Sequence, residues 1–336
     1  MANKINITFL QRKARPVGNY SLEFIFDDVR NRLAHEINST VKYSTYESNG
    51  ILKRLYNTFE AYSNQNDITH VTGDVNYIGC MLRKATTIHT ILDCVALQLS
   101  TGIKQRILKL FWLTIPIKKA RYITAISTAT KLEILKYAPN TNPNKIVVIP
   151  VAISAKFVMV PKVFNTAKPN ILQLGTAINK NIERLIQALS GISCTLTIVG
   201  AYHKHIHELL VQHNIDHRYI QNLTNDEILQ EYSNADIVTL ISTYEGFGMP
   251  ILEAQATGRV VITASVFSMP EVAGDAAHIV DPLSIADMQL GFTKIINDAP
   301  YRNELINRGY NNIKRYDPDL IANMYLDLYK KIISNK

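Results

Sequence analysis

The sequence predicts an α/β protein built from two doubly wound domains. Short runs rich in Val, Ile and Thr alternate with longer segments of helical periodicity, which is typical of βαβ units. The chain has 336 residues, enough for about two domains. A segment near its middle has no clean period and contains Pro161 and Pro169, so it separates two series of predicted strands.

Two series of strands set the expected domain boundaries. The first comprises INITFL (5–10), TVKYSTY (40–46), DITHVTG (67–73), TTIHTIL (86–92), YITAIS (122–127) and KIVVIP (145–150). The second comprises NILQLG (170–175), TLTIVG (195–200), DIVTLIS (236–242), VVITA (260–264) and AAHIV (276–280). The expected organisation is an N-terminal Rossmann-like domain over 1–155, a linker over 156–168, a C-terminal Rossmann-like domain over 169–316, and a helix over 317–336 that packs back on the N-terminal domain.

The composition is that of a folded protein with an anionic partner. The 36 Lys and Arg residues against 28 Asp and Glu give a net charge of +8, which favours a nucleotide, phospholipid or nucleic-acid partner. The basic residues lack interleaved aromatics in a known motif, which argues against nucleic acid. No apolar run is long enough to span a membrane, the N-terminus does not resemble a signal peptide, and the three cysteines show no CxxC spacing. We therefore expect a cytoplasmic protein without a disulfide framework.

The most informative segment is DIVTLISTYEGFGMPILEAQATGRVVI (236–262), predicted to form a strand, a loop, a helix and a strand. Pro250 suits the first turn of a helix, and Gly258 suits the position after its end, where φ is positive. Gly246 and Gly248 allow close approach of a ligand to the backbone just before the helix N-terminus, whose N–H groups favour an anion. The segment therefore predicts an anion site at the carboxyl end of a strand.

Two carboxylates, Glu245 and Glu253, flank this expected anion site. Carboxylate oxygens accept hydrogen bonds from vicinal hydroxyls, so a glutamate beside a phosphate site suits a ribose or a hexose. The pair alone is also compatible with a solvated Glu245 and a Glu253 that offsets the helix dipole. The glycines, the proline and the small residues around the pair favour the binding site.

At these residues the chain resembles the family-4 glycosyltransferases of GT-B architecture. Their signature places two glutamates in EGFGxPxxEAxAxG, and every fixed position is present in residues 245–258. Weaker similarity is found in HVTGD (70–74), TIH (87–89), ARYITAIST (120–128), KIVVIP (145–150), GTAINKNIERLIQAL (175–189) and SMPEVAGDAAHIVDP (268–282). The resemblance implies two Rossmann-like domains facing a cleft, of which the C-terminal one binds a nucleoside diphosphate sugar and the N-terminal one binds the acceptor.

The resemblance also implies roles for single residues. Glu253 would bind the nucleotide ribose, and Glu245 would bind hydroxyls of the transferred sugar. Backbone amides near that sugar would come from Gly246, Phe247 and Gly248. Lys180 matches the family's phosphate-binding lysine and would stabilise the leaving diphosphate. His89, at the end of a predicted strand, matches a histidine near the sugar and would contact a hydroxyl or the reacting centre.

The chain departs from the family pattern at several positions. An arginine often accompanies the phosphate-binding lysine, whereas this chain has Thr176 and Asn179 there, and Thr176 is kept as a donor-binding candidate. The Gly-rich loop after the first strand is reduced to Gly18, the candidate for an acceptor or phosphate loop. No credible Asp-x-Asp is present, so we expect neither a metal nor another cofactor, with Lys180 and the helix dipole balancing the diphosphate charge.

Together these features predict a retaining, metal-independent hexosyltransferase. It would move a sugar from a UDP- or GDP-sugar to a glycan or lipid-linked acceptor in cell-surface polysaccharide or lipopolysaccharide biosynthesis. A dedicated nucleophile is not evident, which favours front-face attack. Two alternatives stay open: a non-catalytic sugar-nucleotide-binding subunit of a transferase complex, and a GT-B sugar-nucleotide epimerase or phosphorylase.

Residues 103–121 are a candidate surface for the inner face of the cell membrane. No Asp or Glu lies between Cys94 and Leu132, and this stretch holds several basic residues and the only tryptophan, Trp112. Such a segment can rest on anionic lipid that presents the acceptor. The competing interpretation is a crossover helix whose apolar residues pack on the sheet and whose basic rim is incidental.

Overall fold

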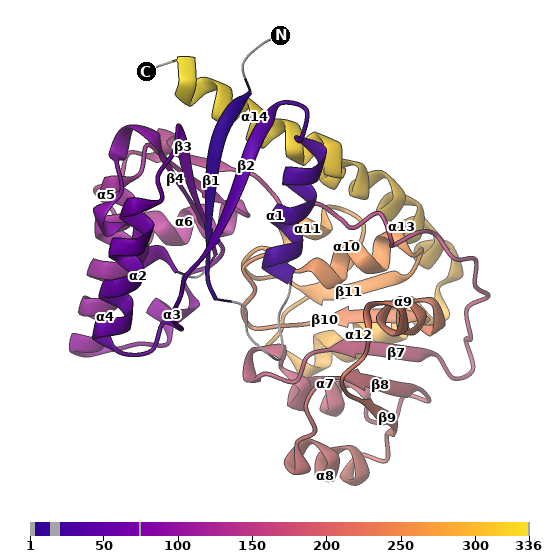
Figure 1. The fold of residues 1–336 in the computed structure, drawn as a ribbon. Coiled ribbons are helices and arrows are strands. Elements are labelled where there is room, and N and C mark those ends of the chain that lie inside the picture. Colours follow the sequence, from indigo (N-terminus) through magenta and orange to yellow (C-terminus); the bar gives the residue numbers. More distant parts are fainter. Residues whose placement is uncertain (1–3, 14–20, 74, 335–336) are drawn as a thin grey trace. The chain divides into compact units, whose positions relative to one another are not determined.

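The computed structural model describes residues 4–13, 21–73 and 75–334 and divides the chain into two compact units (Figure 1). The N-terminal unit combines Met1–Ala152 with Pro318–Lys336, and the C-terminal unit is Ile153–Asp317. In the described ranges, no helix has both the length and the apolar character to cross a membrane.

The N-terminal unit contains a parallel six-stranded sheet in the order β2-β1-β3-β4-β5-β6. Its strands are β1 (Ile5–Gln11), β2 (Ile37–Tyr43), β3 (Ile68–Thr72), β4 (Thr87–Ile91), β5 (Tyr122–Ala125) and β6 (Ile146–Val148). Every residue of β3 and β4 is buried, as expected for central strands of a parallel sheet that is covered on both faces.

The strands of this unit are connected by helices, as parallel strands require. These are α1 (Ser21–Arg32), α2 (Ile51–Ser63), α3 (Val95–Gln98), α4 (Gly102–Leu108), α5 (Ile115–Lys119) and α6 (Thr128–Tyr137). Shorter turns are η1 (Asn76–Met81), η2 (Lys84–Thr86), the π-helical η3 (Lys109–Thr114) and η4 (Pro143–Lys145). The last helix of the chain, α14 (Pro318–Ser334), completes the unit.

The C-terminal unit contains a second parallel sheet, in the order β12-β11-β10-β7-β8-β9. Its strands are β7 (Asn170–Leu174), β8 (Thr195–Val199), β9 (Asp216–Ile220), β10 (Ile237–Leu240), β11 (Val260–Ala264) and β12 (His278–Val280). With these strands counted along the chain, the order is that of the doubly wound dinucleotide-binding sheet, which reverses between its first and fourth strands. Strands β7 and β10 therefore flank the point of reversal.

The helices of the C-terminal unit begin and end at local signals in the sequence. They are α7 (Ile182–Leu189), α8 (Lys204–Gln212), α9 (Asn225–Asn234), α10 (Met249–Ala256), α11 (Met269–Ala273), α12 (Ile285–Asn297) and α13 (Ala299–Asn312), with the turns η5 (Ile178–Lys180) and η6 (Ile313–Tyr316). Thr224 and Glu227 form a capping box at the start of α9. Gly258, after α10, has a φ of 77°, which confirms its expected conformation.

The segment expected to be a linker, 156–168, belongs to the C-terminal unit. Buried Asp236 helps to hold this segment on the C-terminal unit. Its carboxylate accepts a hydrogen bond from the backbone N–H of Asn165 (3.1 Å) and pairs with Lys162. Further along, the Val160 N–H donates to the Thr257 carbonyl (3.4 Å). The segment lacks secondary-structure periodicity because side-chain contacts, rather than a strand or helix, hold it to its unit.

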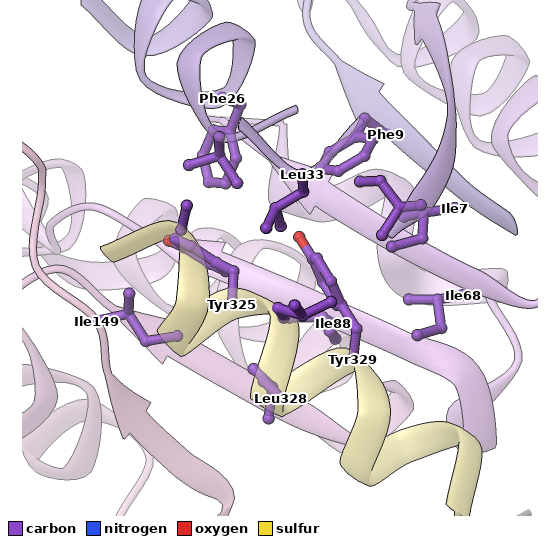
Figure 2. Packing of buried hydrophobic residues seen from close by; sticks show 14 of the residues in the cluster. Ile7, Phe9, Phe26, Leu33, Ile68, Ile88, Ile149, Tyr325, Leu328 and Tyr329 are labelled. Carbon is purple, nitrogen blue, oxygen red and sulfur yellow. The ribbon is translucent and has the colours of Figure 1, made fainter. Parts of the chain in front are cut away.

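Helix α14 lies against the sheet and α1 in the core of the N-terminal unit (Figure 2). His70, in β3, is fully buried among aromatic rings, and its Nδ1 is hydrogen bonded to Tyr329 Oη (2.9 Å). Its Nε2 is hydrogen bonded to Thr90 Oγ1 (2.8 Å). Burial, and then the nearby His89, lower the pKa of His70 to about 3, so the ring is neutral at physiological pH. One hydrogen bond thus joins the last helix to a central strand.

Replacing Tyr329 with Phe removes the hydroxyl partner of a buried imidazole nitrogen while keeping the ring. We expect Tyr329→Phe to lower the free energy of unfolding by about 1–2 kcal/mol, measured by urea denaturation. Tyr43→Phe is the matched control, because the Tyr43 side chain is exposed, and it should change stability little. Equal stabilities of the two variants would contradict a structural role for the Tyr329–His70 bond.

Candidate active site

The candidate site lies where β7 and β10 end side by side in the C-terminal unit. The two strands are parallel neighbours, with Ile171 opposite Ile237. The loop after β7 leads into Lys180, and the loop after β10 contains Glu245. In doubly wound sheets, ligands bind outside the carboxyl ends of the strands at the point where the strand order reverses. The two predicted signature regions therefore meet at the edge where such sheets bind ligands.

The loop after β7 has a conformation that places Lys180 over the backbone of Gly175. Gly175 has a φ of 82°, and a Cβ at this position would lie 2.9 Å from Lys180 Cε. A side chain here would be strained and would displace the lysine. Asn181 follows Lys180 with a left-handed φ of 59° and precedes α7. The glycine thus leaves the space that the lysine side chain occupies.

Two asparagines tie this loop to the loop after β10. The Thr243 N–H donates to the Asn179 carbonyl (2.8 Å), and the Asn179 side-chain amide donates to the Tyr244 carbonyl (3.0 Å). The Asn181 amide donates to the Ile241 carbonyl (3.2 Å). Because these bonds join residues 60 or more positions apart in sequence, they fix the two loops as one surface.

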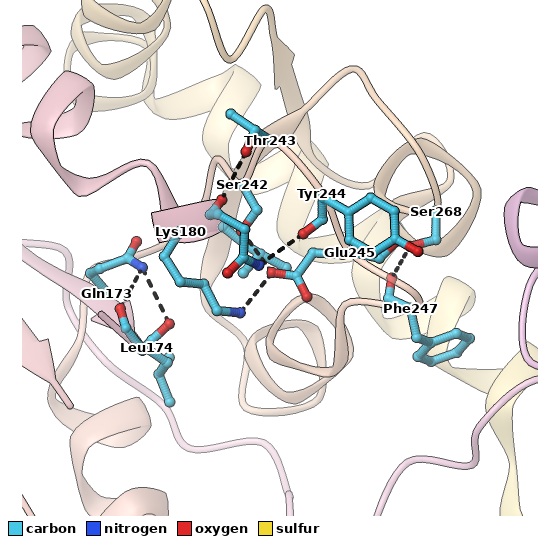
Figure 3. Close-up of polar contacts among 12 residues, drawn as sticks. Gln173, Leu174, Lys180, Ser242, Thr243, Tyr244, Glu245, Phe247 and Ser268 are labelled. Carbon is cyan, nitrogen blue, oxygen red and sulfur yellow. Dashed lines mark hydrogen bonds and ion pairs between the residues drawn. The ribbon is translucent and has the colours of Figure 1, made fainter. Parts of the chain in front are cut away.

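An ion pair joins the two loops at the centre of the site (Figure 3). Lys180 Nζ lies 2.6 Å from Glu245 Oε1, and the Ser242 hydroxyl donates to the same oxygen (2.7 Å). The side chains of Lys180 and Glu245 are 18% and 16% exposed. Partial burial reduces the screening of their attraction, so the pair is stronger than one on the open surface. Both side chains are thereby ordered without any ligand.

One serine, Ser268, is hydrogen bonded to the backbone of the glycine-containing loop 245–248. The Ser268 hydroxyl contacts the carbonyls of Glu245 (2.9 Å) and Phe247 (2.7 Å), as Figure 3 shows for Phe247. The Phe247 ring is buried against Tyr316, with the centroids 5.8 Å apart. Gly248 has a φ of 109° and precedes α10, so its conformation favours glycine. The loop enters the N-terminus of α10 in a defined conformation.

Glu253 lies in α10 and is hydrogen bonded to the hydroxyl of Tyr232, a fully buried residue of α9. Burial raises the pKa of Glu253 to about 7, while the Tyr232 hydrogen bond and the positive charge of Lys180 oppose this rise. Burial also raises the pKa of Tyr232 well above its ordinary value, so Tyr232 acts as the donor. A carboxyl that titrates near neutral pH beside an ion pair is a frequent property of functional sites.

The other residues predicted for the site are Thr176, Gly18 and His89. Thr176 is partly exposed in the loop after β7, and its side chain packs against Gly200, where a Cβ would lie 2.9 Å from Thr176 Cγ2. Gly18 lies outside the described residues. His89 belongs to the N-terminal unit. No group of three or more His, Cys, Asp or Glu side chains within the described ranges is arranged to hold a metal ion.

His89 has a different position from the one expected from the sequence. It was expected at the end of a strand, but β4 continues to Ile91 because two further residues pair with β5, and the His89 ring is fully buried. Neither ring nitrogen has a hydrogen-bond partner in the described part of the chain. A Cβ on Gly79 would lie 2.0 Å from His89 Nε2, so the ring packs directly on that glycine. Burial, and then Lys145, lower the pKa of His89 to about 3.

Comparison with known families identifies the unit that carries this site. Residues 156–312 match the family described as glycosyl transferases group 1. The C-terminal unit belongs to this family. The matched range contains Lys180, Glu245 and Glu253, so the ion pair and the neighbouring carboxyl lie within the glycosyltransferase domain.

Individual relatives agree with this family. The chain is 30% identical to O-antigen chain mannosyltransferase B of Escherichia coli over 113 residues, which is 34% of this chain and 30% of that protein. Matches to the first three curated relatives cover 30%, 42% and 14% of their lengths. The chain thus matches less than half of each of these relatives.

Solved glycosyltransferases share the fold over nearly the whole chain. HepE from Anabaena, solved in complex with UDP and glucose, has a TM-score of 0.76 at 15% identity, covering 97% of this chain and 100% of that one. WaaG, a glycosyltransferase involved in lipopolysaccharide biosynthesis, has a TM-score of 0.73 at 14% identity, covering 96% and 99%. The two parallel six-stranded α/β sheets therefore represent the GT-B fold.

Several residues of the glycosyltransferase domain were not identified from the sequence. Asn179 was interpreted only as the replacement of an arginine, whereas its amide and carbonyl tie the two site loops together. Ser242 and Tyr232 donate hydrogen bonds to the carboxylates of Glu245 and Glu253, and Ser268 donates to the backbone carbonyls of Glu245 and Phe247. The signal available for Ser268 was its place in the weaker family match at 268–282, which has no spacing that points to Glu245.

The raised pKa of Glu253 predicts a pH-dependent cost of its burial. The folded-state pKa of Glu253 is about 7 and its ordinary value is 4.5. The stability contributed by the neutral carboxyl is therefore complete below about pH 4.5 and is lost as pH rises through about 7. Glu253→Gln cannot ionise and still accepts the Tyr232 hydrogen bond. At about pH 8 it should therefore be more stable than wild type, by on the order of 1–3 kcal/mol.

Urea denaturation at several pH values measures this difference. The gain in Glu253→Gln should shrink as pH falls and disappear near pH 4.5. Glu208→Gln is the control, because Glu208 is an exposed helical glutamate paired with Lys204, and no comparable gain is expected. A Glu253→Gln difference that is the same at all pH values would contradict a carboxyl that is neutral in the folded state.

Proposed function

We propose that the protein is a retaining glycosyltransferase that transfers a hexose from a nucleoside diphosphate sugar to a glycan or lipid-linked acceptor. The observation that carries the proposal is the Lys180–Glu245 ion pair at the carboxyl ends of β7 and β10, with Glu253 in the adjoining helix. Lys180 supplies a positive charge, and the two carboxylates can accept hydrogen bonds from hydroxyl groups. All three lie at the edge of the sheet where anions are expected to bind. The family of the C-terminal unit supports the same reaction.

The donor is proposed to bind across this edge. Glu253 accepts hydrogen bonds from the ribose hydroxyls, and its carboxyl is best suited to this when ionised. Lys180 and the N-terminus of α10 attract the diphosphate. Glu245 and the backbone of residues 246–248 lie beside the transferred sugar, and Thr176 lies beside the phosphates. Structures of HepE with UDP-glucose and with UDP support a donor of this class.

The reaction is proposed to proceed by front-face attack. The bond between the anomeric carbon and the diphosphate oxygen breaks, and the acceptor oxygen forms its bond on the same face, which retains the configuration. The leaving phosphate takes the proton of the acceptor hydroxyl. Lys180 stabilises the negative charge that develops on that phosphate, which makes a divalent cation unnecessary. The N-terminal unit supplies the acceptor side, with Gly18 as its candidate residue.

The role of the product is proposed to be in cell-surface polysaccharide or lipopolysaccharide synthesis at the inner face of the cell membrane. The likeness to an O-antigen mannosyltransferase and to WaaG supports this context. A thermal-shift screen of UDP-, GDP- and ADP-sugars identifies the donor, because the bound one raises the melting temperature by mass action. Transfer of radiolabelled sugar to an acceptor then separates a transferase from a non-catalytic subunit or an epimerase.

The two carboxylates should have separable effects on the donor. Glu253→Gln should weaken binding of both the sugar nucleotide and the bare nucleoside diphosphate, by on the order of 1.5–3 kcal/mol, because both contain the ribose. Glu245→Gln should reduce turnover while leaving nucleoside diphosphate affinity nearly unchanged, because it touches the sugar alone. Calorimetry and single-turnover kinetics measure the two quantities, with Glu208→Gln as the control. Equal losses in both variants would reject the division of roles.

Activity should survive a chelator and depend on Lys180. With EDTA present the transfer rate is expected to stay unchanged, whereas Lys180→Ala should slow it by about 10²-fold or more, as loss of a charge-stabilising group does. Lys180→Arg, which keeps the charge, should recover part of the rate. Thermal melting controls for folding, because Lys180→Ala leaves Glu245 without its partner. A loss of activity in EDTA that Mn²⁺ or Mg²⁺ restores would overturn the metal-independent reaction.

A further inference from the structure

Helix α2 has the reverse of the usual amphipathic arrangement. Its buried residues are small or polar, namely Asn57, Thr58 and Ala61. Its large apolar residues face solvent with 50–82% of their surface exposed: Ile51, Leu52, Leu55, Tyr56, Phe59 and Tyr62. At 100° per residue these six positions span one continuous face, opposite the buried one. A helix on a soluble domain normally buries its apolar face, so this exposed face needs a partner.

A second apolar face lies on the segment formed by α4 and η3. Its exposed apolar residues are Ile103, Ile107, Leu110 and Phe111. Farther along the chain Leu113 of η3 and Ile117 of α5 are buried in the core with α6 and β5. The predicted membrane segment 103–121 thus divides into an exposed apolar part and a part that packs as scaffold.

The two helical segments pack against the same turn, η1, within the N-terminal unit. The Arg54 guanidinium of α2 lies over the ring of Trp112 in η3, 5.4 Å from its centroid. Trp112 also contacts Tyr77 of η1, with the centroids 4.8 Å apart. The apolar faces of α2 and α4–η3 therefore belong to one region of the unit.

The charges around these faces are almost all positive. The exposed basic side chains of these elements are Lys53, Arg54, Lys104 and Arg106, with Lys109 partly exposed. Along α2, α4 and η3 the one acidic residue is Glu60. Apolar and aromatic side chains bordered by Lys and Arg are the pattern of helices that lie in the interface of an anionic bilayer. Charge complementarity thus selects a negatively charged lipid surface over a neutral one.

We propose that the exposed apolar faces of α2 and α4–η3 form one docking surface for an anionic lipid bilayer. The apolar side chains enter the headgroup region while the flanking Lys and Arg side chains contact lipid phosphates. This surface goes beyond the predicted segment 103–121, because α2 supplies most of its apolar residues. It is independent of the donor site, which lies in the other unit.

Vesicle co-sedimentation of the full chain tests the docking surface. We expect binding to phosphatidylcholine vesicles that contain about 30% phosphatidylglycerol, little binding to phosphatidylcholine alone, and release in about 1 M NaCl, where charge attraction is screened within about 3 Å. The triple variant Leu52→Gln, Leu55→Gln, Phe59→Gln keeps every charge and should lower the partition coefficient at least tenfold. The variant Lys53→Gln, Lys104→Gln, Arg106→Gln should lose the preference for anionic lipid.

The matched control replaces three equally exposed apolar residues of the C-terminal unit, Val163→Gln, Leu283→Gln and Leu290→Gln, and should bind vesicles like wild type. Donor-induced thermal shifts should be the same in all these variants, which separates this surface from the proposed catalytic function. Unchanged vesicle binding by the α2 triple variant would overturn the proposal. The binding would then be explained by a purely electrostatic contact, for example at the cavity lined by Lys84, Arg121 and Lys145. Absence of binding, or a dimer in light scattering that the α2 variant dissociates, would overturn it as well.

Discussion

The pairing of β7 with β10 is the constraint on which the candidate site depends. These strands are separated by more than 60 residues, yet their parallel register ends both at one edge and directs the following loops toward each other. Asn179 and Asn181 then join the loops through backbone carbonyls, which brings Lys180 and Glu245 together. These contacts hold both charged side chains at the edge of the sheet where doubly wound domains bind ligands.

The N-terminal unit distributes its polar and apolar groups unusually. Two histidines are buried in adjacent strands of its sheet: His70 uses both ring nitrogens in hydrogen bonds, whereas those of His89 have no partner in the described part of the chain. At the same time large apolar side chains of α2 face solvent. Unsatisfied buried polar atoms and exposed apolar faces both cost stability. In this unit the exposed apolar face of α2 is the feature that indicates a partner.

Sequence patterns predicted the features that depend on local physics. The strands of both sheets other than β9, and the positive φ of Gly258, follow from periodicity and from short-range sterics. Strand β9 was missed because it lies at the sheet edge with polar, partly exposed residues and so lacks an apolar run. The attachment of 156–168 and the contacts of Asn179 and Ser268 were also missed. Single hydrogen bonds between distant segments leave no periodic trace in a sequence.

The position of α14 has a consequence for the order in which the protein is made. The N-terminal unit places its sheet first in the chain, but Tyr325 and Tyr329, from the last helix, complete its core. On the ribosome the C-terminal unit therefore emerges in full before the N-terminal one can close its core, although domains commonly finish in the order of synthesis. Until α14 emerges, the β1–β3 region exposes the apolar surface that this helix later covers.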